Sequence, residues 1–272
     1  MKIFSSVAFI SLFTLCAFSQ GLEKVEVEKF YVASDIDTVS ELYTFPLKKN
    51  SVTYRVYLDL KPGYSLQAVF GSPEHPLFIK TSTFFFNHSE HGDAIPNVIP
   101  HRTLTKNTVM LDSWLSVGAS GEDSYAVPLN EDDTVETVKH TKFLLSREHN
   151  NQLYLKDGIR FSPKVPRPTF FNINKVNEVF GNKNDKNEFI VDNGGWFCLG
   201  GSKGVDSLKS NKILIGQFTT DGDFSFEINV QLGTPTPGVS EKYVAINPAG
   251  SDLTHSGLIF DSRKNKFKIL KK

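Results

Sequence analysis

Hydrophobic and polar residues alternate over short stretches of this chain, and clusters of glycine, proline, asparagine and charged residues separate these stretches. A period of two is typical of β-strands, because successive side chains of a strand point to opposite faces of its sheet. Patterns with the helical period are scarce. The strands predicted in this way span residues 25–32, 53–60, 66–70, 77–86, 109–117, 188–191, 196–199, 212–219, 224–232, 243–246 and 267–270.

The clearest hairpin pattern lies near the C-terminal end of this series. Asp221-Gly222-Asp223 separates two strong strand patterns, 212–219 and 224–232, and predicts a tight β-hairpin. The second arm is expected to have a core face and a solvated face, carrying Phe224, Phe226, Ile228 and Val230 against Ser225, Glu227, Asn229 and Gln231.

An earlier pair of strands follows the same logic. Residues 53–60 place Tyr54, Val56, Leu58 and Leu60 on one face, and the turn KPGY at 61–64 leads into a returning strand at 66–70.

Alternating strands with one solvated face predict an all-β fold of antiparallel sheets, packed as a β-sandwich or jelly roll. Parallel sheets would need connecting helices that the pattern does not offer. Residues 119–168 have dense charges and frequent prolines, which indicate exposed loops. We expect a single domain over residues 20–272, and a division into two β subdomains near residues 146–168 is the alternative.

The first residues have the pattern of an export signal. Lys2 precedes a mostly apolar run, residues 3–18, that is shorter than the roughly 20 residues of a membrane span. Ala17 and Ser19 fit a cleavage site after Ser19, so residues 1–19 are predicted to be a signal peptide. A lipoprotein modified at Cys16 and an uncleaved anchor are the alternatives. We expect an exported protein that is secreted, periplasmic or attached to the cell surface.

Charge and cysteine content narrow the function classes. The chain has 30 basic and 30 acidic residues, so no overall field attracts nucleic acid. No further apolar run predicts a transmembrane segment in the mature chain. Cys198 would be the one cysteine left after cleavage, which excludes an internal disulfide, and its strand-forming neighbours favour an inert buried thiol over a nucleophile.

Calcium is the cofactor that the loops suggest. Loops dense in side-chain oxygens lie at 34–37, 182–187 and 221–223, although none completes the twelve-residue EF-hand pattern. The preferred Ca²⁺ ligands belong to the second of these loops and are Asn182, Asn184, Asp185 and Asn187.

The sequence has few patterns that are typical of catalytic sites. The segment HSEHGD at 88–93 lacks the H-E-x-x-H spacing of zinc enzymes and is interpreted as a polar loop, and GASG at 118–121 lacks the spacing of a nucleophile elbow. A glycosidase pair depends on the distance between two carboxyl groups in space, roughly 5–9 Å. The carboxylates on or beside predicted strands are Asp59, Asp112, Glu188 and Glu227.

Aromatic residues give the stronger hint of function. The chain has 23 Phe, 8 Tyr and 2 Trp, and most should pack in the core. An exposed ring could stack on a sugar, although burial is the more frequent expectation for both tryptophans. The ligand-binding candidates are Tyr54, Tyr57, Tyr64, Trp114 and Trp196, with Tyr31 also considered.

Several segments together resemble a known family. VTYRVYLDLKPGY at 52–64, LDSWLSVG at 111–118 and FEINVQLG at 226–233, with residues 21–32, 193–196 and 215–222, are similar to an uncharacterised exported β-rich module of Bacteroidetes-type bacteria. The resemblance covers most of the mature chain. Such modules are often found in long surface or secreted proteins that end in a sorting domain, whereas only a short tail follows Gly250 here. The resemblance implies export and a β-rich fold, and it carries no reaction or ligand.

These observations favour a non-enzymatic exported protein that binds a glycan, another ligand or a surface partner. A polysaccharide-acting hydrolase with a carboxylate pair and a structural envelope protein are the alternatives. Coplanar exposed aromatic rings on one sheet face would favour binding, and two carboxyl groups facing each other across a cleft would favour hydrolysis.

Overall fold

The structure is a computed structural model, and it describes residues 20–38, 47–104, 108–132, 157–181 and 186–264. Over these ranges the chain is β-structure with short turns of 3₁₀-helix and one α-helix, α1 (Val176–Phe180). The strands are β1 (Leu22–Val32), β2 (Val52–Leu60), β3 (Ser65–Gly71), β4 (Leu77–Thr81), β5 (Trp114–Leu115), β6 (Ala119–Gly121), β7 (Ser124–Ala126), β8 (Ile159–Phe161), β9 (Thr169–Phe171), β10 (Glu188–Val191), β11 (Gly194–Ser202), β12 (Lys212–Thr220), β13 (Phe224–Glu227), β14 (Asn229–Gly233), β15 (Ser240–Val244), β16 (Leu253–Thr254) and β17 (Ile259–Asp261).

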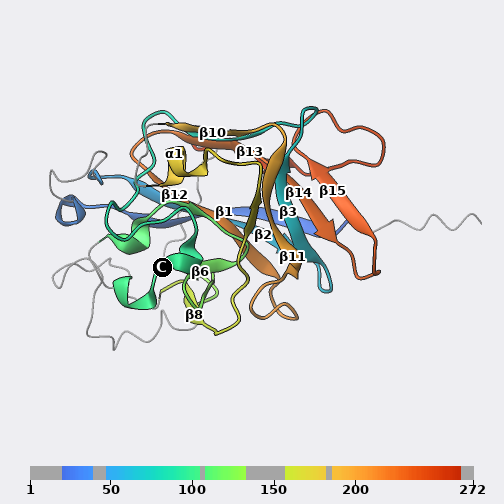
Figure 1. The fold of residues 1–272 in the computed structure, drawn as a ribbon, viewed down its shortest axis with the longest axis horizontal. Helices are drawn as coiled ribbons and strands as arrows, with labels where there is room; N and C mark the ends of the chain where they lie inside the picture. Colours follow the sequence, from blue (N-terminus) through green and yellow to red (C-terminus); the bar gives the residue numbers. More distant parts are fainter. Residues whose placement is uncertain (1–19, 39–46, 105–107, 133–156, 182–185, 265–272) are drawn as a thin grey trace, which may run out of the picture.

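The strands form four sheets, and the all-β prediction is confirmed. The central sheet has the order β1-β2-β12-β5, and the largest sheet has the order β16-β15-β14-β3-β11-β9 (Figure 1). Two smaller sheets have the orders β10-β4-β13-β17 and β6-β7-β8. Pairing is antiparallel apart from β15 with β16, and none of the described sheets closes into a barrel.

The main core lies between the central sheet and the sheets that contain β3 and β4, as in a β-sandwich. Tyr54, Val56 and Leu58 of β2 contribute from one side, and Val69 of β3 and Ile79 of β4 contribute from the other. The aromatic rings are in contact: the Phe224 ring centroid lies 4.9 Å from that of Tyr54 and 5.2 Å from that of Phe218. Burial of these side chains is the main favourable contribution to folding.

The central sheet is covered on its second face as well, which the alternation did not predict. Tyr57 and Leu214 point away from the main core and are buried together with Phe30, Trp114 and Ile159. The cover consists of 3₁₀ turns within residues 96–111 and the small sheet β6-β7-β8, and only the sheet comes from the region predicted as exposed loops. A strand buried on both faces shows no solvated side, and seven of the nine residues of β2 are accordingly buried.

Both predicted strand–turn–strand units are wrong in their pairing. β12 pairs with β2 and β5, whereas β13 pairs with β4 and β17, so residues 221–223 connect two different sheets. Similarly, the 61–64 turn leads from β2 in the central sheet to β3 in the largest sheet. The second arm also divides at Ile228, and Asn229, expected on the wet face, is buried. Residues 61–64 and 221–223 are turns, as predicted, but each connects a strand of one sheet to a strand of another sheet.

Other predicted strands differ in extent. β4 ends at Thr81, and residues 109–117 begin as a 3₁₀ turn before the two residues of β5. β15 lies a few residues before the predicted 243–246, and 267–270 lies outside the described residues, as do 1–19 and 133–156. In the described part of the chain, no helix is long and apolar enough to span a membrane.

Candidate functional site

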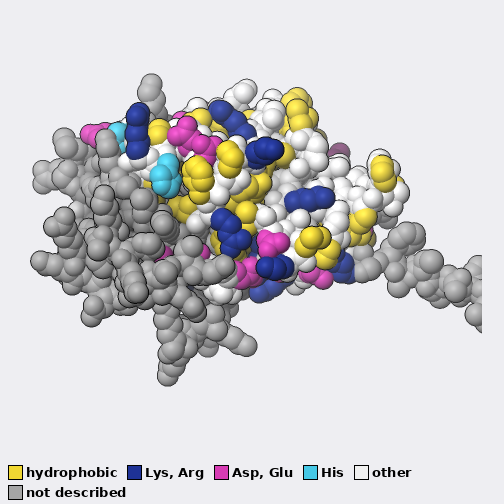
Figure 2. All heavy atoms as spheres, turned by 90° about the horizontal axis from the view of Figure 1, so that it is seen from below, with side chains coloured by type: hydrophobic (Ala, Val, Ile, Leu, Met, Phe, Trp, Pro, Cys, Tyr) yellow, Lys and Arg dark blue, Asp and Glu magenta, His cyan; other side chains and the backbone are white. Residues whose placement is uncertain are grey.

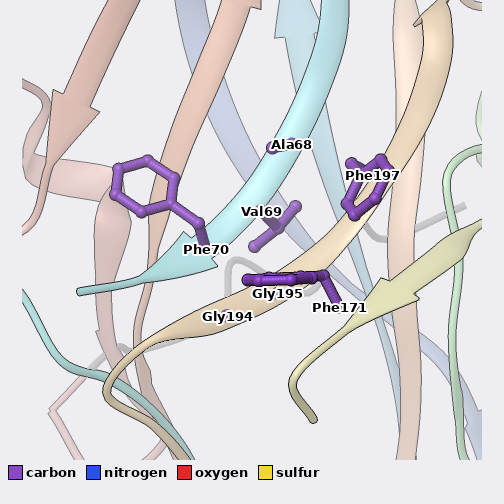
Figure 3. A pocket seen from close by; sticks show the side chains of 7 residues that line it. All are labelled: Ala68, Val69, Phe70, Phe171, Gly194, Gly195 and Phe197. Carbon is purple, nitrogen blue, oxygen red and sulfur yellow. The ribbon is translucent and has the colours of Figure 1, made fainter.

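A shallow apolar groove lies on the outer face of the largest sheet. Phe70 of β3 and Phe171 of β9 lie on either side of Gly195 of β11, because both residues pair with Gly195 in the strand register. Phe197 lies two residues further along β11 and completes the wall (Figure 3). Ala68 and Gly194 line the groove as well. It therefore forms where three neighbouring strands present phenylalanine around glycine.

The glycine floor is required by the packing of the strands. A Cβ atom on Gly195 would overlap with the Val69 carbonyl oxygen, and a Cβ atom on Gly194 would overlap with the Phe171 carbonyl oxygen. Glycine in a strand interior often marks such a close approach. The missing side chains leave a depression, and the Phe171 ring extends across it from β9 (Figure 3). An aromatic ring beside a glycine also stabilises the sheet locally.

The groove walls remain open to water. Phe171 is 58% exposed, and Phe70 and Phe197 are half-buried. The Phe171 ring is seen edge-on while the Phe70 ring is seen face-on, so the rings form walls and not a coplanar platform (Figure 3). The groove encloses about 240 Å³. Enclosed ligand pockets measure roughly 300–1,000 Å³, so this groove suits a single ring whose remainder stays in solvent.

Polar side chains rim the groove along one cross-strand row. Lys242, Gln231, Ala68, Phe197 and Thr169 lie side by side across five strands. The amide groups of Gln231 and its neighbour Gln67 are hydrogen-bonded to each other at 2.9 Å. Because both amides are only half-buried, their remaining donors and acceptors can serve a ligand.

Most of the predicted ligand-binding rings lie in the interior. Tyr54, Tyr57, Trp114 and Trp196 are each 5% exposed or less, so they present no face to solvent. Tyr54 stacks on Phe224, and the Trp196 indole donates to the Ser116 carbonyl oxygen at 2.9 Å. The expectation that both tryptophans are buried is confirmed, and a stacking platform made of these four rings is excluded by their burial.

The remaining tyrosines have structural partners. Tyr64 is half-exposed, and its hydroxyl donates to Glu241 at 3.1 Å on the side of the sheet that faces β1. Tyr31 is buried, and its hydroxyl donates to Asp37 at 2.8 Å. That carboxylate also accepts from the backbone and hydroxyl groups of Ser34, so the 34–37 loop is closed by its own side chains.

The calcium loop lies outside the described residues for Asn182, Asn184 and Asp185, so this prediction stays open. Asn187 is described and exposed, and its amide donates to the Thr81 carbonyl oxygen at 3.3 Å. In the alternative loop, Asp221 binds Lys48 and Thr83, which hold its pKa below the usual range against the opposing effect of burial. Among the described residues, no group of three or more His, Cys, Asp or Glu is arranged to hold a metal ion.

The four strand carboxylates are spread over three places in the fold, and only Glu188 and Glu227 share a sheet. Asp59 is on the central sheet, Glu188 and Glu227 are on β10 and β13, and Asp112 precedes β5. Asp112 is fully buried and accepts the backbone N–H groups of His88 and Asp93 at 2.7 and 2.8 Å. Burial raises its pKa well above the usual value despite these hydrogen bonds. The 88–93 segment is a loop, as interpreted, and Asp112 fixes its shape.

Cys198 follows the groove residue Phe197 on β11, but its side chain packs against the main core. Its thiol is free and half-buried, and burial raises its pKa. A raised pKa keeps the thiol protonated, which fits an inert residue.

A second polar cluster lies under the cover of the central sheet. Arg55 is 1% exposed and donates to Gln217 at 2.8 Å and to the Gly158 carbonyl oxygen at 2.9 Å, while its guanidinium lies 3.5 Å from the Phe30 ring centroid. Glu28 is its cross-strand neighbour, and burial raises the Glu28 pKa to about 7. One Glu28 oxygen is buried without a hydrogen-bond partner, and the buried Tyr57 hydroxyl lies beside Arg55.

The groove phenylalanines were missed by the sequence reasoning, although a signal was present. Trp196 was expected to be buried, and alternation along β11 then places Phe197 on the outer face. No comparable signal existed for Phe171, because no strand was predicted at residues 169–171.

Charged residues of both signs are interspersed on the face of the molecule shown in Figure 2. Figure 2 shows hydrophobic side chains next to Lys, Arg, Asp and Glu on one face, so that face has no field of a single sign. This distribution agrees with the balanced charge of the whole chain. Comparison of the chain with family models, curated proteins and solved structures found no match in any of the three.

Proposed function

We propose that this is an exported, non-enzymatic binding protein whose ligand occupies the groove of Phe70, Phe171 and Phe197. One observation carries the proposal: three aromatic walls surround a glycine floor on the solvent face of a sheet. Exposed apolar surface rimmed by polar side chains is a common mark of a binding site, because such surface is otherwise buried.

A glycan is the ligand class that suits this groove best. A sugar ring has an apolar face of C–H groups and an edge of hydroxyl groups. The phenylalanine walls match the former, and the amide groups of Gln67 and Gln231 match the latter. The groove volume fits one ring, so a terminal sugar or a single residue of a longer glycan would be recognised.

Export is the second part of the proposal. Lys2, the apolar run that follows it and the small residues Ala17 and Ser19 support a signal peptide. A binding protein of this kind would act in the periplasm, at the cell surface or in the medium.

A glycan array probed with residues 20–272 tests the binding function, followed by calorimetric titration of any glycan that binds. Phe171→Ala should weaken that glycan at least tenfold, which corresponds to about 1.4 kcal/mol. Leu199→Ala is the matched control, because Leu199 lies on the neighbouring strand β11 of the same sheet and is 81% exposed but does not line the groove. Equal losses in the two variants, or an array without binding, would contradict the proposal.

The same samples test calcium. If the 182–187 loop binds Ca²⁺ in the folded protein, the melting temperature should rise with Ca²⁺ and fall with a chelator, because an ion bound to the native state stabilises it. Asn187→Ala should abolish that difference. A melting temperature that is identical in both conditions would rule out a stabilising calcium site.

A further inference from the structure

His75 lies in the turn between β3 and β4, close to the end of β3 that carries Phe70, and both nitrogens of its ring face acceptors. Nδ1 is 3.1 Å from the Ile246 carbonyl oxygen, and Nε2 is 3.2 Å from a carboxylate oxygen of Asp252. A neutral imidazole has one N–H and one lone pair, so it can donate to one of these acceptors only. The cationic ring donates to both. The surroundings of His75, which is 3% exposed, are therefore built for the imidazolium.

Asp252 remains ionised and joins this histidine to the groove. Burial alone would raise the Asp252 pKa, but the Ala249 N–H, Lys242 and His75 outweigh burial and hold it below the usual value. The second Asp252 oxygen binds the Lys242 ammonium at 3.2 Å. Lys242 in turn lies 5.8 Å from the ring centroid of Phe70, within the range of a cation–π interaction.

Asn229 makes a second connection between His75 and the groove wall. Its side-chain amide donates to the Phe70 carbonyl oxygen at 3.1 Å and to the His75 carbonyl oxygen at 2.8 Å. Its oxygen accepts the Ala245 N–H at 2.9 Å. The end of β3, the β3–β4 turn and the end of β15 are thus held by one buried side chain.

We propose that the proton on His75 controls the groove: the imidazolium fastens the 246–252 segment to the β3–β4 turn and so keeps Phe70 and Lys242 in their binding positions. Loss of the proton turns a lone pair toward the Asp252 carboxylate or breaks the bond to Ile246. The 246–252 segment then separates from the β3–β4 turn, Lys242 moves with Asp252, and Phe70 is no longer held in its binding position.

The charged groups that face His75 are few. Asp252 and Lys242 approach it from the β15–β16 side, and Glu74 lies beside it in the β3–β4 turn. Because only the imidazolium can donate to both acceptors, ligand binding should weaken when His75 loses its proton at higher pH.

The proposal rests on the proposed function of the groove, so its test has one readout that needs no ligand. NMR would follow the His75 ring nitrogens, the Phe70 ring signals and hydrogen exchange at the Ala245 amide between pH 5 and 9. All three should change together. An unchanged Phe70 signal and an unchanged Ala245 exchange rate during the His75 titration would overturn the proposal, whatever the groove binds.

The second readout is binding of 1-anilinonaphthalene-8-sulfonate, assigned to the groove by its loss in Phe171→Ala. Wild-type binding should weaken about five- to tenfold across the titration, within the usual range for coupled sites. Asp252→Asn removes the charge that favours the imidazolium, so the midpoint should move to lower pH without a change in side-chain size. His101→Gln, in the cover on the other side of the molecule, should leave the midpoint unchanged.

The failures can be told apart. If the dye never binds while Phe70 and Ala245 still follow His75, the binding function of the groove fails and the control of the wall by His75 stands. If the dye binds with the same affinity at every pH, the groove is a binding site that His75 does not control. A midpoint unaffected by Asp252→Asn would show that another group titrates.

Discussion

The two faces of the central sheet are both buried, but they are built on different principles. Toward the main core, β2 presents Tyr54 and Val56, and the Tyr54 ring stacks on Phe224 within a cluster of apolar side chains. Toward the cover, the same strand presents Arg55 and Tyr57, and Arg55 is surrounded by hydrogen-bond acceptors. Apolar packing tolerates small displacements of its partners. A buried cation does not, because it must keep its acceptors to offset the cost of desolvation.

The largest effect is expected on the apolar face. Phe224→Ala removes a ring that packs against Tyr54, Phe218 and Phe260, and should lower the free energy of unfolding by about 4 kcal/mol. Urea denaturation followed by fluorescence would measure it. Ile190→Ala is the control, since Ile190 is 50% exposed and should change stability by about 0.5 kcal/mol or less. A loss below about 1 kcal/mol for Phe224→Ala would show that this face can collapse around a cavity.

On the cover face, loss of the Arg55 cation should lower the free energy of unfolding somewhat less than Phe224→Ala does on the apolar face. Arg55→Ala leaves Gln217 and the Gly158 carbonyl oxygen without their donor and should destabilise the protein by about 3 kcal/mol. Arg55→Met keeps most of the volume but not the donors, so it should recover less than half of that loss. Full recovery in Arg55→Met would mean that packing, and not the hydrogen bonds, holds this face together.

The smallest effect is expected at Glu28 and has the opposite sign. Burial raises the folded-state pKa of Glu28 from 4.5 to about 7, so folding binds a proton between these pH values. The contribution of Glu28 to the free energy of unfolding of the wild type is constant below pH 4.5. It decreases as the pH rises from 4.5 to about 7, and it is constant again above pH 7. Glu28→Gln carries no charge at any pH and keeps an oxygen for the Leu129 N–H.

Glu28→Gln should therefore be more stable than wild type by about 2 kcal/mol above pH 7 and similar to it below pH 4.5. At about 1.4 kcal/mol per pH unit, the interval between the two pKa values sets an upper limit of roughly 3.4 kcal/mol, and solvent screening of the half-buried Glu28 side chain lowers the expected gain. Chemical denaturation at pH 4 and pH 8 checks both values. Lys80→Gln, which breaks an exposed ion pair with Glu188, provides a control with little expected change. A variant that is less stable than wild type at pH 8 would show that Arg55 needs the Glu28 charge.

The groove illustrates how far sequence reasoning reached toward the candidate site. The strands at 66–70 and 196–199 were predicted, and alternation from a buried Trp196 points Phe197 outward. Phe70 and Phe171 could not be assigned, because they meet only through their shared register with Gly195, and Phe171 is 24 positions away along the chain. Of the rings chosen in their place, Tyr54, Tyr57 and Trp114 are buried because both faces of the central sheet are covered, and Trp196 is buried in the main core from the largest sheet.

The sequence by itself determined the fold class and the positions of most strands and turns, because alternation and turn chemistry depend on neighbours within a few residues. Which strands pair was decided only in the tertiary structure: β12 joins β2 from more than 150 positions away, and 61–64 and 221–223 connect sheets and not partners. The second cover, the buried Arg55 and the groove all follow from those distant pairings. Their energies arise from contacts that no local pattern encodes.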